Sequence, residues 1–127
     1  MAKTFRVILD TNFLVDIFRF RLGFEAVEDA LGGRCEYVMA SQSVAELRRL
    51  ADESAAVGAT FISSGKIAVV AAGRATEKSA DEAIVDLVRK WAHEAVVATN
   101  DEKLRKRIKA LGARTIYLRA RKRLEVS

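Results

Sequence analysis

The sequence of 127 residues contains no proline, one cysteine and one histidine. The lone Cys35 cannot form a disulfide within the chain, and there is no cluster of Cys and His residues to bind a structural zinc ion. The longest apolar run, residues 67–72, is too short to cross a bilayer, and no apolar segment of secretion-signal length precedes Asp10. These absences exclude a disulfide scaffold, a zinc module and a membrane protein. We therefore expect a soluble, cytoplasmic protein.

Acidic residues are scarce in the last fifth of the chain. From Lys103 onward ten residues are basic and only Glu125 is acidic, whereas the net charge of the whole chain is +5. Such a concentration of positive charge is typical of surfaces that bind the phosphate backbone of nucleic acids, although a solvated helix face has the same composition. The candidate contacts lie on one predicted helix: Lys103, Arg105, Lys106, Arg107 and Lys109.

Apolar strands alternate with helices along the whole chain. The strands are predicted at residues 5–9, 36–40, 67–70, 95–98 and 115–118. The helices are predicted at residues 11–21, 24–31, 41–64 and 80–91 and around Leu104, Ile108 and Leu111, with a loop at residues 73–78. Short connections of this kind imply right-handed crossovers and a parallel sheet. We expect one α/β domain over residues 1–127 with about five parallel strands, ending in a basic tail at residues 119–127.

Phenylalanine is concentrated in the predicted helical hairpin over residues 11–31. Four of the six Phe residues lie there: Phe13, Phe18, Phe20 and Phe24. A helix that is apolar on nearly every side must be covered on every side. The hairpin therefore belongs either to the core or to the surface of a dimer or partner, and the sequence favours neither.

Four acidic residues are predicted to reach one edge of the sheet. Asp10 follows the first strand, and Asp101 follows the fourth. Glu46 lies in the first turns of the helix after the second strand, and Asp81 opens the helix after the third. The carboxyl ends of parallel strands share an edge, and ligands of such sheets bind outside it. We expect the four carboxylates to converge there.

Each of these acids also has a structural interpretation as a helix cap. Asp10 and Asp101 fit N-cap positions, and the spacings Ser43-x-x-Glu46 and Ser79-x-x-Glu82 fit capping boxes. Considered singly, the cap is the better interpretation for each residue. Considered together, four converging carboxylates repel one another and raise each other's pKa unless a cation lies among them. A hard divalent ion, Mg²⁺ or Mn²⁺, satisfies this need and predicts metal-assisted hydrolysis of a phosphodiester.

These residues also carry a resemblance to a known family. Four motifs occur in order: Asp10-Thr11-Asn12 after a buried strand, Glu46-Leu47, Asp81-x-x-Ile84, and Thr99-Asn100-Asp101-x-x-Leu104. In combination they resemble a PIN domain over essentially the whole chain. The resemblance implies a three-layer, Rossmann-like α/β/α sandwich, Mg²⁺- or Mn²⁺-dependent endoribonuclease activity, RNA as substrate and frequent homodimers.

The resemblance also assigns roles to individual residues. It implies that Asp10, Glu46, Asp81 and Asp101 are the catalytic metal ligands. It further implies that Asn12 orients the first of these acids and that Thr99 supplies the hydroxyl beside the last. Either Asp81 or Glu82 can be the third ligand, and we prefer Asp81, which leaves Glu82 for the cap.

Three biological settings stay open at this point. The stretch 97–118 is most similar to archaeal relatives of the ribosomal-RNA-processing Fcf1 group. Those rRNA-processing members of the PIN family that carry an added zinc ribbon are excluded by the lone cysteine. The same domain serves as the VapC-type toxin of toxin–antitoxin pairs, whose partner is an antitoxin protein. The rival from another class is a non-catalytic RNA-binding or scaffold protein whose acids are only helix caps.

Overall fold

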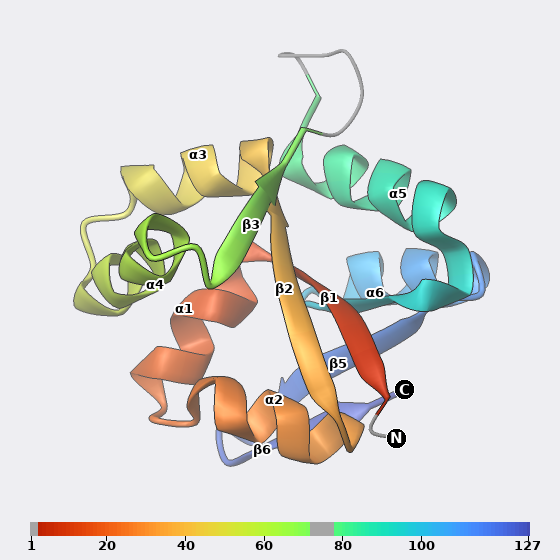
Figure 1. The fold of residues 1–127 in the computed structure, drawn as a ribbon, viewed down its shortest axis with the longest axis horizontal. Helices are drawn as coiled ribbons and strands as arrows, with labels where there is room; N and C mark the ends of the chain where they lie inside the picture. Colours follow the sequence, from red (N-terminus) through yellow and green to blue (C-terminus); the bar gives the residue numbers. More distant parts are fainter. Residues whose placement is uncertain (1–2, 72–77) are drawn as a thin grey trace.

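The computed structural model describes residues 3–71 and 78–127 (Figure 1). The strands are β1 (Thr4–Leu9), β2 (Arg34–Ala40), β3 (Ile67–Val70), β4 (Ala95–Ala98), β5 (Arg114–Arg119) and β6 (Arg123–Val126). The helices are α1 (Thr11–Arg19), α2 (Gly23–Leu31), α3 (Ser41–Arg49), α4 (Glu53–Ser63), α5 (Ala80–Trp91) and α6 (Glu102–Ala110), with a short 3₁₀ helix η1 (Ala92–Glu94). Of the loop predicted at residues 73–78, all but Lys78 lies outside the described residues.

The described strands form one sheet in the order β3-β2-β1-β4-β5-β6. The first five in this order are parallel, as predicted, because each is joined to the next along the chain through helices. Strand β6 is an additional, antiparallel edge strand. The pairing of Leu9 with Ala98 places the residues that follow β1 and β4, Asp10 and Thr99, next to each other at the carboxyl edge.

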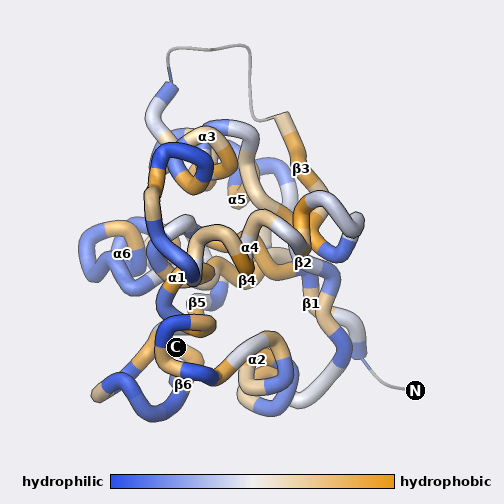
Figure 2. Tube along the Cα trace, turned by 90° about the vertical axis from the view of Figure 1, so that its left-hand side faces the viewer, coloured by the Kyte–Doolittle hydropathy of each residue, from blue (hydrophilic) through white to orange (hydrophobic). Residues whose placement is uncertain are grey.

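Helices cover both faces of the sheet, which confirms the predicted α/β/α sandwich. Val7 and Leu9 of β1 pack in a core with α1, α2 and α4, whereas Ile8 faces the core formed by α5 and α6. This follows from the alternation of side chains along a strand. In Figure 2 the tube of α6 is predominantly hydrophilic. Its inward-facing Leu104 and Ile108 are buried, so that its charged residues face outward.

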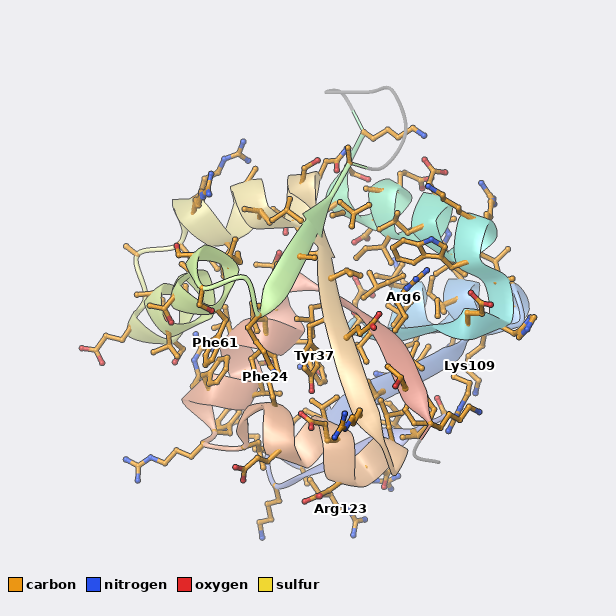
Figure 3. All side chains as sticks on the ribbon, in the orientation of Figure 1. Arg6, Phe24, Tyr37, Phe61, Lys109 and Arg123 are labelled. Atoms are coloured by element: carbon orange, nitrogen blue, oxygen red, sulfur yellow. The ribbon has the colours of Figure 1, made fainter. Side chains whose placement is uncertain are left out.

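The phenylalanines of the α1–α2 hairpin pack largely inside the chain's own core. The Phe24 ring lies 4.3 Å from the Tyr37 ring and 4.9 Å from the Phe61 ring, measured between centroids (Figure 3). Phe18 stacks on Phe61 with a centroid distance of 5.2 Å. The aromatic side chains of the hairpin thus pack it against α4 and β2.

In the described residues no helix has the length and apolarity needed to traverse a bilayer.

Two predicted elements differ from the structure. The helix predicted over residues 41–64 is two helices, because the Asp52 side chain accepts hydrogen bonds from the backbone N–H groups of Ser54 and Ala55 and starts α4 afresh. Leu50, which lies at this break, is 43% exposed. Residues 119–127, predicted as a tail, contain the end of β5 and strand β6. Leu124 and Val126 alternate with charged residues and pack on the core, which makes this segment a strand.

Candidate active site

The side chains of Asp10 and Thr99 meet at the carboxyl edge of the two central strands. Asp10 Oδ2 accepts a hydrogen bond of 2.7 Å from Thr99 Oγ1, and Asp10 Oδ1 accepts one of 2.9 Å from the backbone N–H of Thr11. The Thr99 hydroxyl in turn accepts a bond of 3.1 Å from the backbone N–H of Asp101. Both side chains are buried, with 5% of Asp10 and 0% of Thr99 exposed. Asp10 is therefore held in one orientation by a residue of α1 and by the residue that follows β4.

The electrostatics of Asp10 are unfavourable for its charged form. Its pKa is raised from 3.8 to about 6 in total: burial raises it most, the negative charges of Asp81 and Glu46 add to this, and the hydrogen bonds from Thr99 and from the backbone of Thr11 partly offset the rise. The pKa of Asp81 is raised by burial and by the charge of Asp101, which the charge of Arg107 partly offsets. The four acids predicted to converge thus act on one another electrostatically at this edge. Glu46 and Asp101 are exposed, and Asp81 is half-buried.

The cap interpretation is correct for Asp10 and Asp101 and wrong for the segment that contains Glu46. Asp101 Oδ1 accepts a hydrogen bond of 3.1 Å from the backbone N–H of Leu104, at the start of α6. Helix α3 already begins at Ser41, so Ser43 lies inside the helix and Glu46 completes no capping box. Among residues 3–71 and 78–127, the buried Ser43 hydroxyl finds no hydrogen-bond partner. Asp10 and Asp101 thus cap their helices and lie at the carboxyl edge of the sheet at the same time.

The two acids of the doublet Asp81-Glu82 make different contacts. Glu82 accepts a hydrogen bond of 2.8 Å from Arg107 of α6, so its side chain does not complete the predicted capping box with Ser79. Ser79 still caps α5 by accepting a bond of 3.2 Å from the backbone N–H of Glu82. Of the two acids, only Asp81 acts on the pKa of Asp10. These contacts fit the preference for Asp81 as the third ligand, which stays a prediction.

A cleft of about 530 Å³ adjoins this edge. Asn12, Asp16, Arg19, Asn100 and Asp101 are among its lining residues. Asn12 is exposed, and the hydrogen bonds that orient Asp10 come instead from Thr11 and Thr99. The predicted orienting role thus belongs to Thr99, whereas Asn12 contributes to the wall of the cleft.

The sequence analysis missed a hydrogen-bond network in this wall. Asn100 Nδ2 donates to Asp16 Oδ2 at 2.9 Å, and Asn100 Oδ1 accepts from the backbone N–H of Leu118 at 2.8 Å. Arg19 pairs with Asp16 at 3.3 Å and with Asp52 at 2.8 Å. Asn100 therefore ties α1 to β5 beside Asp101. The sequence did contain one indication of this wall: the spacing of Asn12, Asp16 and Arg19 places their side chains on one face of a helix.

The chemistry of these residues fits a hard divalent cation. The charges that act on Asp10 are those of Asp81 and Glu46, both negative, and carboxylate oxygens are the ligands that Mg²⁺ and Mn²⁺ prefer. In the part of the chain that the structure describes, no three His, Cys, Asp or Glu side chains are close enough to hold an ion by themselves. Mg²⁺ keeps several water ligands and can be bound by only one or two carboxylates.

The basic residues of α6 differ in their surroundings. Lys106 pairs with Glu102 at 3.4 Å, and the guanidinium of Arg105 lies 3.9 Å from the centroid of the Tyr117 ring. Arg107 is engaged by Glu82, as described above. Lys103 and Lys109 are exposed. Of the five predicted nucleic-acid contacts, two thus take part in ion pairs, one stacks on an aromatic ring, and Lys103 and Lys109 are exposed.

Comparison with known proteins agrees with this geometry. The profile of the PIN-like domain family matches residues 7–121. The ribonuclease VapC4 of Methanocaldococcus jannaschii is 28% identical over 127 residues, which cover 96% of this chain and 96% of that protein. The structure of the PIN domain endonuclease Utp24 superposes with a TM-score of 0.82 at 22% identity, covering 96% of this chain and 90% of that one, and so shares the fold. Since the family profile spans most of the sequence, this chain belongs to the PIN-like domain family.

Proposed function

We propose that the protein is a divalent-metal-dependent endoribonuclease that hydrolyses RNA phosphodiester bonds. The observation that carries the proposal is the buried Asp10, whose pKa is raised to about 6 by burial and by two neighbouring carboxylates. A fold maintains such an unfavourable group most readily where its function requires it. The similarity to the ribonuclease VapC4 and to the PIN domain endonuclease Utp24 supports the same reaction class.

Each residue has a part in this proposal. Asp10 and Asp81, with Glu46 and Asp101 at the rim, would hold Mg²⁺ or Mn²⁺ directly or through water. The bound ion would supply Lewis acidity and activate water as the nucleophile at neutral pH. Thr99 fixes the Asp10 carboxylate through its 2.7 Å hydrogen bond. Exposed lysines of α6 would bind phosphates on either side of the cleaved bond.

The proposal is tested by cleavage of an end-labelled single-stranded RNA. We expect cleavage with Mg²⁺ or Mn²⁺, none in EDTA, and none by Asp10→Asn with the metal present. The matched control is Asp29→Asn, an exposed aspartate on α2, and it should cleave like wild type. RNA binding without cleavage by wild type in any divalent metal would favour the non-catalytic RNA-binding or scaffold alternative.

We propose a VapC-type toxin as the biological setting, with ribosomal RNA processing as the second candidate. The toxin setting is supported by the similarity to VapC4 across the whole length of both proteins, and it implies an antitoxin partner. Expression in a bacterial host should arrest growth, and Asp10→Asn should abolish the arrest. Normal growth with cleavage of precursor ribosomal RNA would instead support processing.

We also propose that the protein acts in the cytoplasm as a homodimer, as the PIN resemblance implies. Sedimentation velocity tests the oligomeric state directly. A single species with twice the mass of the chain supports the dimer, and a concentration-independent monomer contradicts it.

A further inference from the structure

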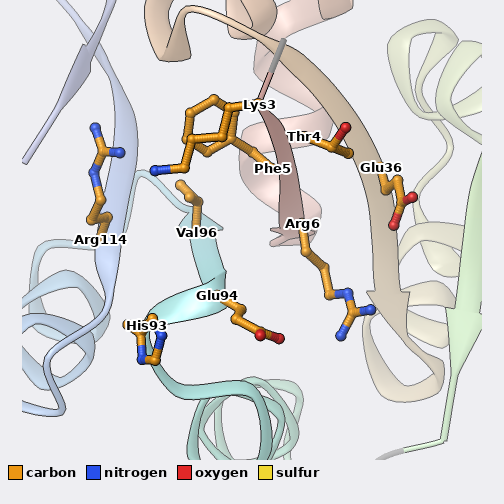
Figure 4. A pocket seen from close by; sticks show the side chains of 9 residues that line it. All are labelled: Lys3, Thr4, Phe5, Arg6, Glu36, His93, Glu94, Val96 and Arg114. Carbon is orange, nitrogen blue, oxygen red and sulfur yellow. The ribbon is translucent and has the colours of Figure 1, made fainter. Parts of the chain in front are cut away.

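A second cavity, of about 390 Å³, lies at the opposite edge of the sheet from Asp10 (Figure 4). It is formed at the amino ends of β1, β4 and β5, and it shares no lining residue with the cleft at the acids. Because β1 spans six residues, the two sites are separated by about 20 Å. A cavity of this size accommodates a phosphate group with part of a nucleotide.

Strand β1 divides the charges of this cavity into two groups. Successive side chains of a strand point to opposite faces, so Lys3 and Arg6 lie on different sides of β1. Figure 4 shows Arg6 on the side of Glu36 and Glu94, whereas the ammonium of Lys3 extends toward Arg114. The acids of the cavity are thus grouped with Arg6, and the side that contains Lys3 and Arg114 is positive.

Lys3 and Arg114 both lie near one buried ring. Lys3 Nζ is 5.3 Å and Arg114 Cζ is 5.8 Å from the centroid of the Phe5 ring, which is 7% exposed. None of the ion pairs in residues 3–71 and 78–127 involves Lys3 or Arg114. Cation–π contact leaves the N–H groups of both side chains available as donors. The two residues therefore present unneutralised donors on a rigid apolar support.

We propose that Lys3 and Arg114 form a phosphate clamp that binds the backbone of the RNA substrate at a distance from the acids. This inference rests on the proposed function, since it supplies an additional contact for the same substrate. A guanidinium binds two phosphate oxygens at once through its planar fork, and an ammonium adds a point charge.

The position of α6 supports RNA as the source of the phosphate. Helix α6 begins next to Asp101 and ends at Ala110, and β5 then begins at Arg114, so the chain passes from the acidic edge to the amino edge of the sheet through α6, which packs on the face opposite to the Arg114 side chain. Lys109 lies near its end, toward the amino end of β5 (Figure 3). An RNA strand bound along the basic residues of α6 can turn around the amino edge of the sheet to reach Arg114, a path that a single nucleotide is too short to span.

The experiment measures RNA binding in EDTA by fluorescence anisotropy, with labelled RNA of about 6 and about 20 nucleotides. The variant is Lys3→Gln/Arg114→Gln. The matched control is Arg21→Gln/Lys90→Gln, which removes two exposed cations that form no ion pair within the described residues. The variant Lys3→Arg/Arg114→Lys keeps both charges. A thermal melt of each protein shows that it is folded, and Lys3→Gln alone replaces the double variant if that one does not fold.

We expect the clamp variant to bind the long RNA about fivefold to tenfold more weakly, with a salt dependence smaller by about one to two phosphate contacts. Binding of the short RNA should be unchanged, and the charge-keeping variant should recover most of the affinity. An equal loss for both RNAs, or a loss no greater than in the control, would overturn the clamp.

A second arm of the experiment separates the two sources of phosphate. Adenosine monophosphate and inorganic phosphate are added as competitors to the wild type and to the clamp variant. RNA would be overturned as the ligand if the wild type bound the mononucleotide, the clamp variant did not, and both proteins bound the long RNA with the same affinity. All of these measurements are made without metal. They therefore distinguish failure of the clamp from failure of the nuclease proposal, which depends on metal-dependent cleavage.

Discussion

The Thr99 hydroxyl donates a 2.7 Å hydrogen bond to the Asp10 carboxylate across the junction of β4 and β1. These residues are 89 positions apart in the sequence, and the parallel pairing of the two strands brings them together. The bond lowers the pKa of Asp10, while burial and the nearby acids raise it. The balance between these effects determines how easily Asp10 loses its proton, and several predictions depend on it.

The stability of the metal-free protein should decrease as pH rises through the pKa of Asp10. Because the folded pKa is about 6 and the reference value is 3.8, the folded state binds this proton more tightly than the unfolded state. The resulting decrease in the free energy of unfolding is absent below the reference pKa and complete above the folded pKa, with an upper limit of about 3 kcal/mol. In EDTA, Asp10→Asn should be more stable than wild type at about pH 7.5 and similar at about pH 4, by urea denaturation. Equal or lower stability of the variant at the higher pH would contradict this prediction.

Replacement of Thr99 by valine should raise the pKa of Asp10 further. The change removes the donor to Asp10 and the acceptor for the backbone N–H of Asp101, at a cost of about 1–3 kcal/mol in stability. Thr99→Ser keeps the hydroxyl and is the matched control. In RNA cleavage assays the acidic limb of the pH profile should move to higher pH in Thr99→Val only. A pH profile that is the same in both variants would show that the bond does not control Asp10.

The two neighbouring acids of α5 should differ in their effect on catalysis. Asp81→Asn removes a charge that acts on Asp10 and should abolish metal-dependent cleavage. Glu82→Gln removes only the ion pair with Arg107, which is largely exposed, and should leave cleavage and stability nearly unchanged. Cleavage rates of the two variants with Mg²⁺ and Mn²⁺ test this directly. The opposite order of activity would assign the ligand role to Glu82.

Asn100 should stabilise the wall of the cleft more than Asn12. Asn100→Ala breaks the bond to Asp16 and leaves the backbone N–H of Leu118 without its acceptor, at a cost of about 1–3 kcal/mol. Asn12→Ala changes an exposed side chain in the same cleft and should alter stability by less than about 0.5 kcal/mol. Chemical denaturation of the two variants provides the comparison, and equal losses would show that the Asn100 network contributes little.

Local pattern was sufficient to predict most of the elements. The apolar runs at residues 5–9 and 95–98 are strands because both faces of a central parallel strand are buried. Ser79 and Asp101 start their helices as their positions in the sequence indicate. The placement of four acids after or near strand ends follows from the same pattern.

The break at Asp52 was harder to predict, since the surrounding small and apolar residues are compatible with one continuous helix. Its carboxylate caps α4 and also pairs with Arg19 of α1 at 2.8 Å, a contact between residues far apart in the sequence. Strand β6 was similarly missed, because its basic residues concealed a short alternation of apolar side chains that gains stability only by pairing with β5.

By itself the sequence determined the order of the five parallel strands and of most helices, and the delivery of Asp10, Glu46, Asp81 and Asp101 to one edge, because these depend on periodicity and on the direction of parallel strands. Only the tertiary structure decided that Thr99 orients Asp10, that Glu82 is engaged by Arg107, and that Asn100 joins α1 to β5. Each of these contacts joins residues from separate elements, and its energy depends on a distance that no local pattern contains.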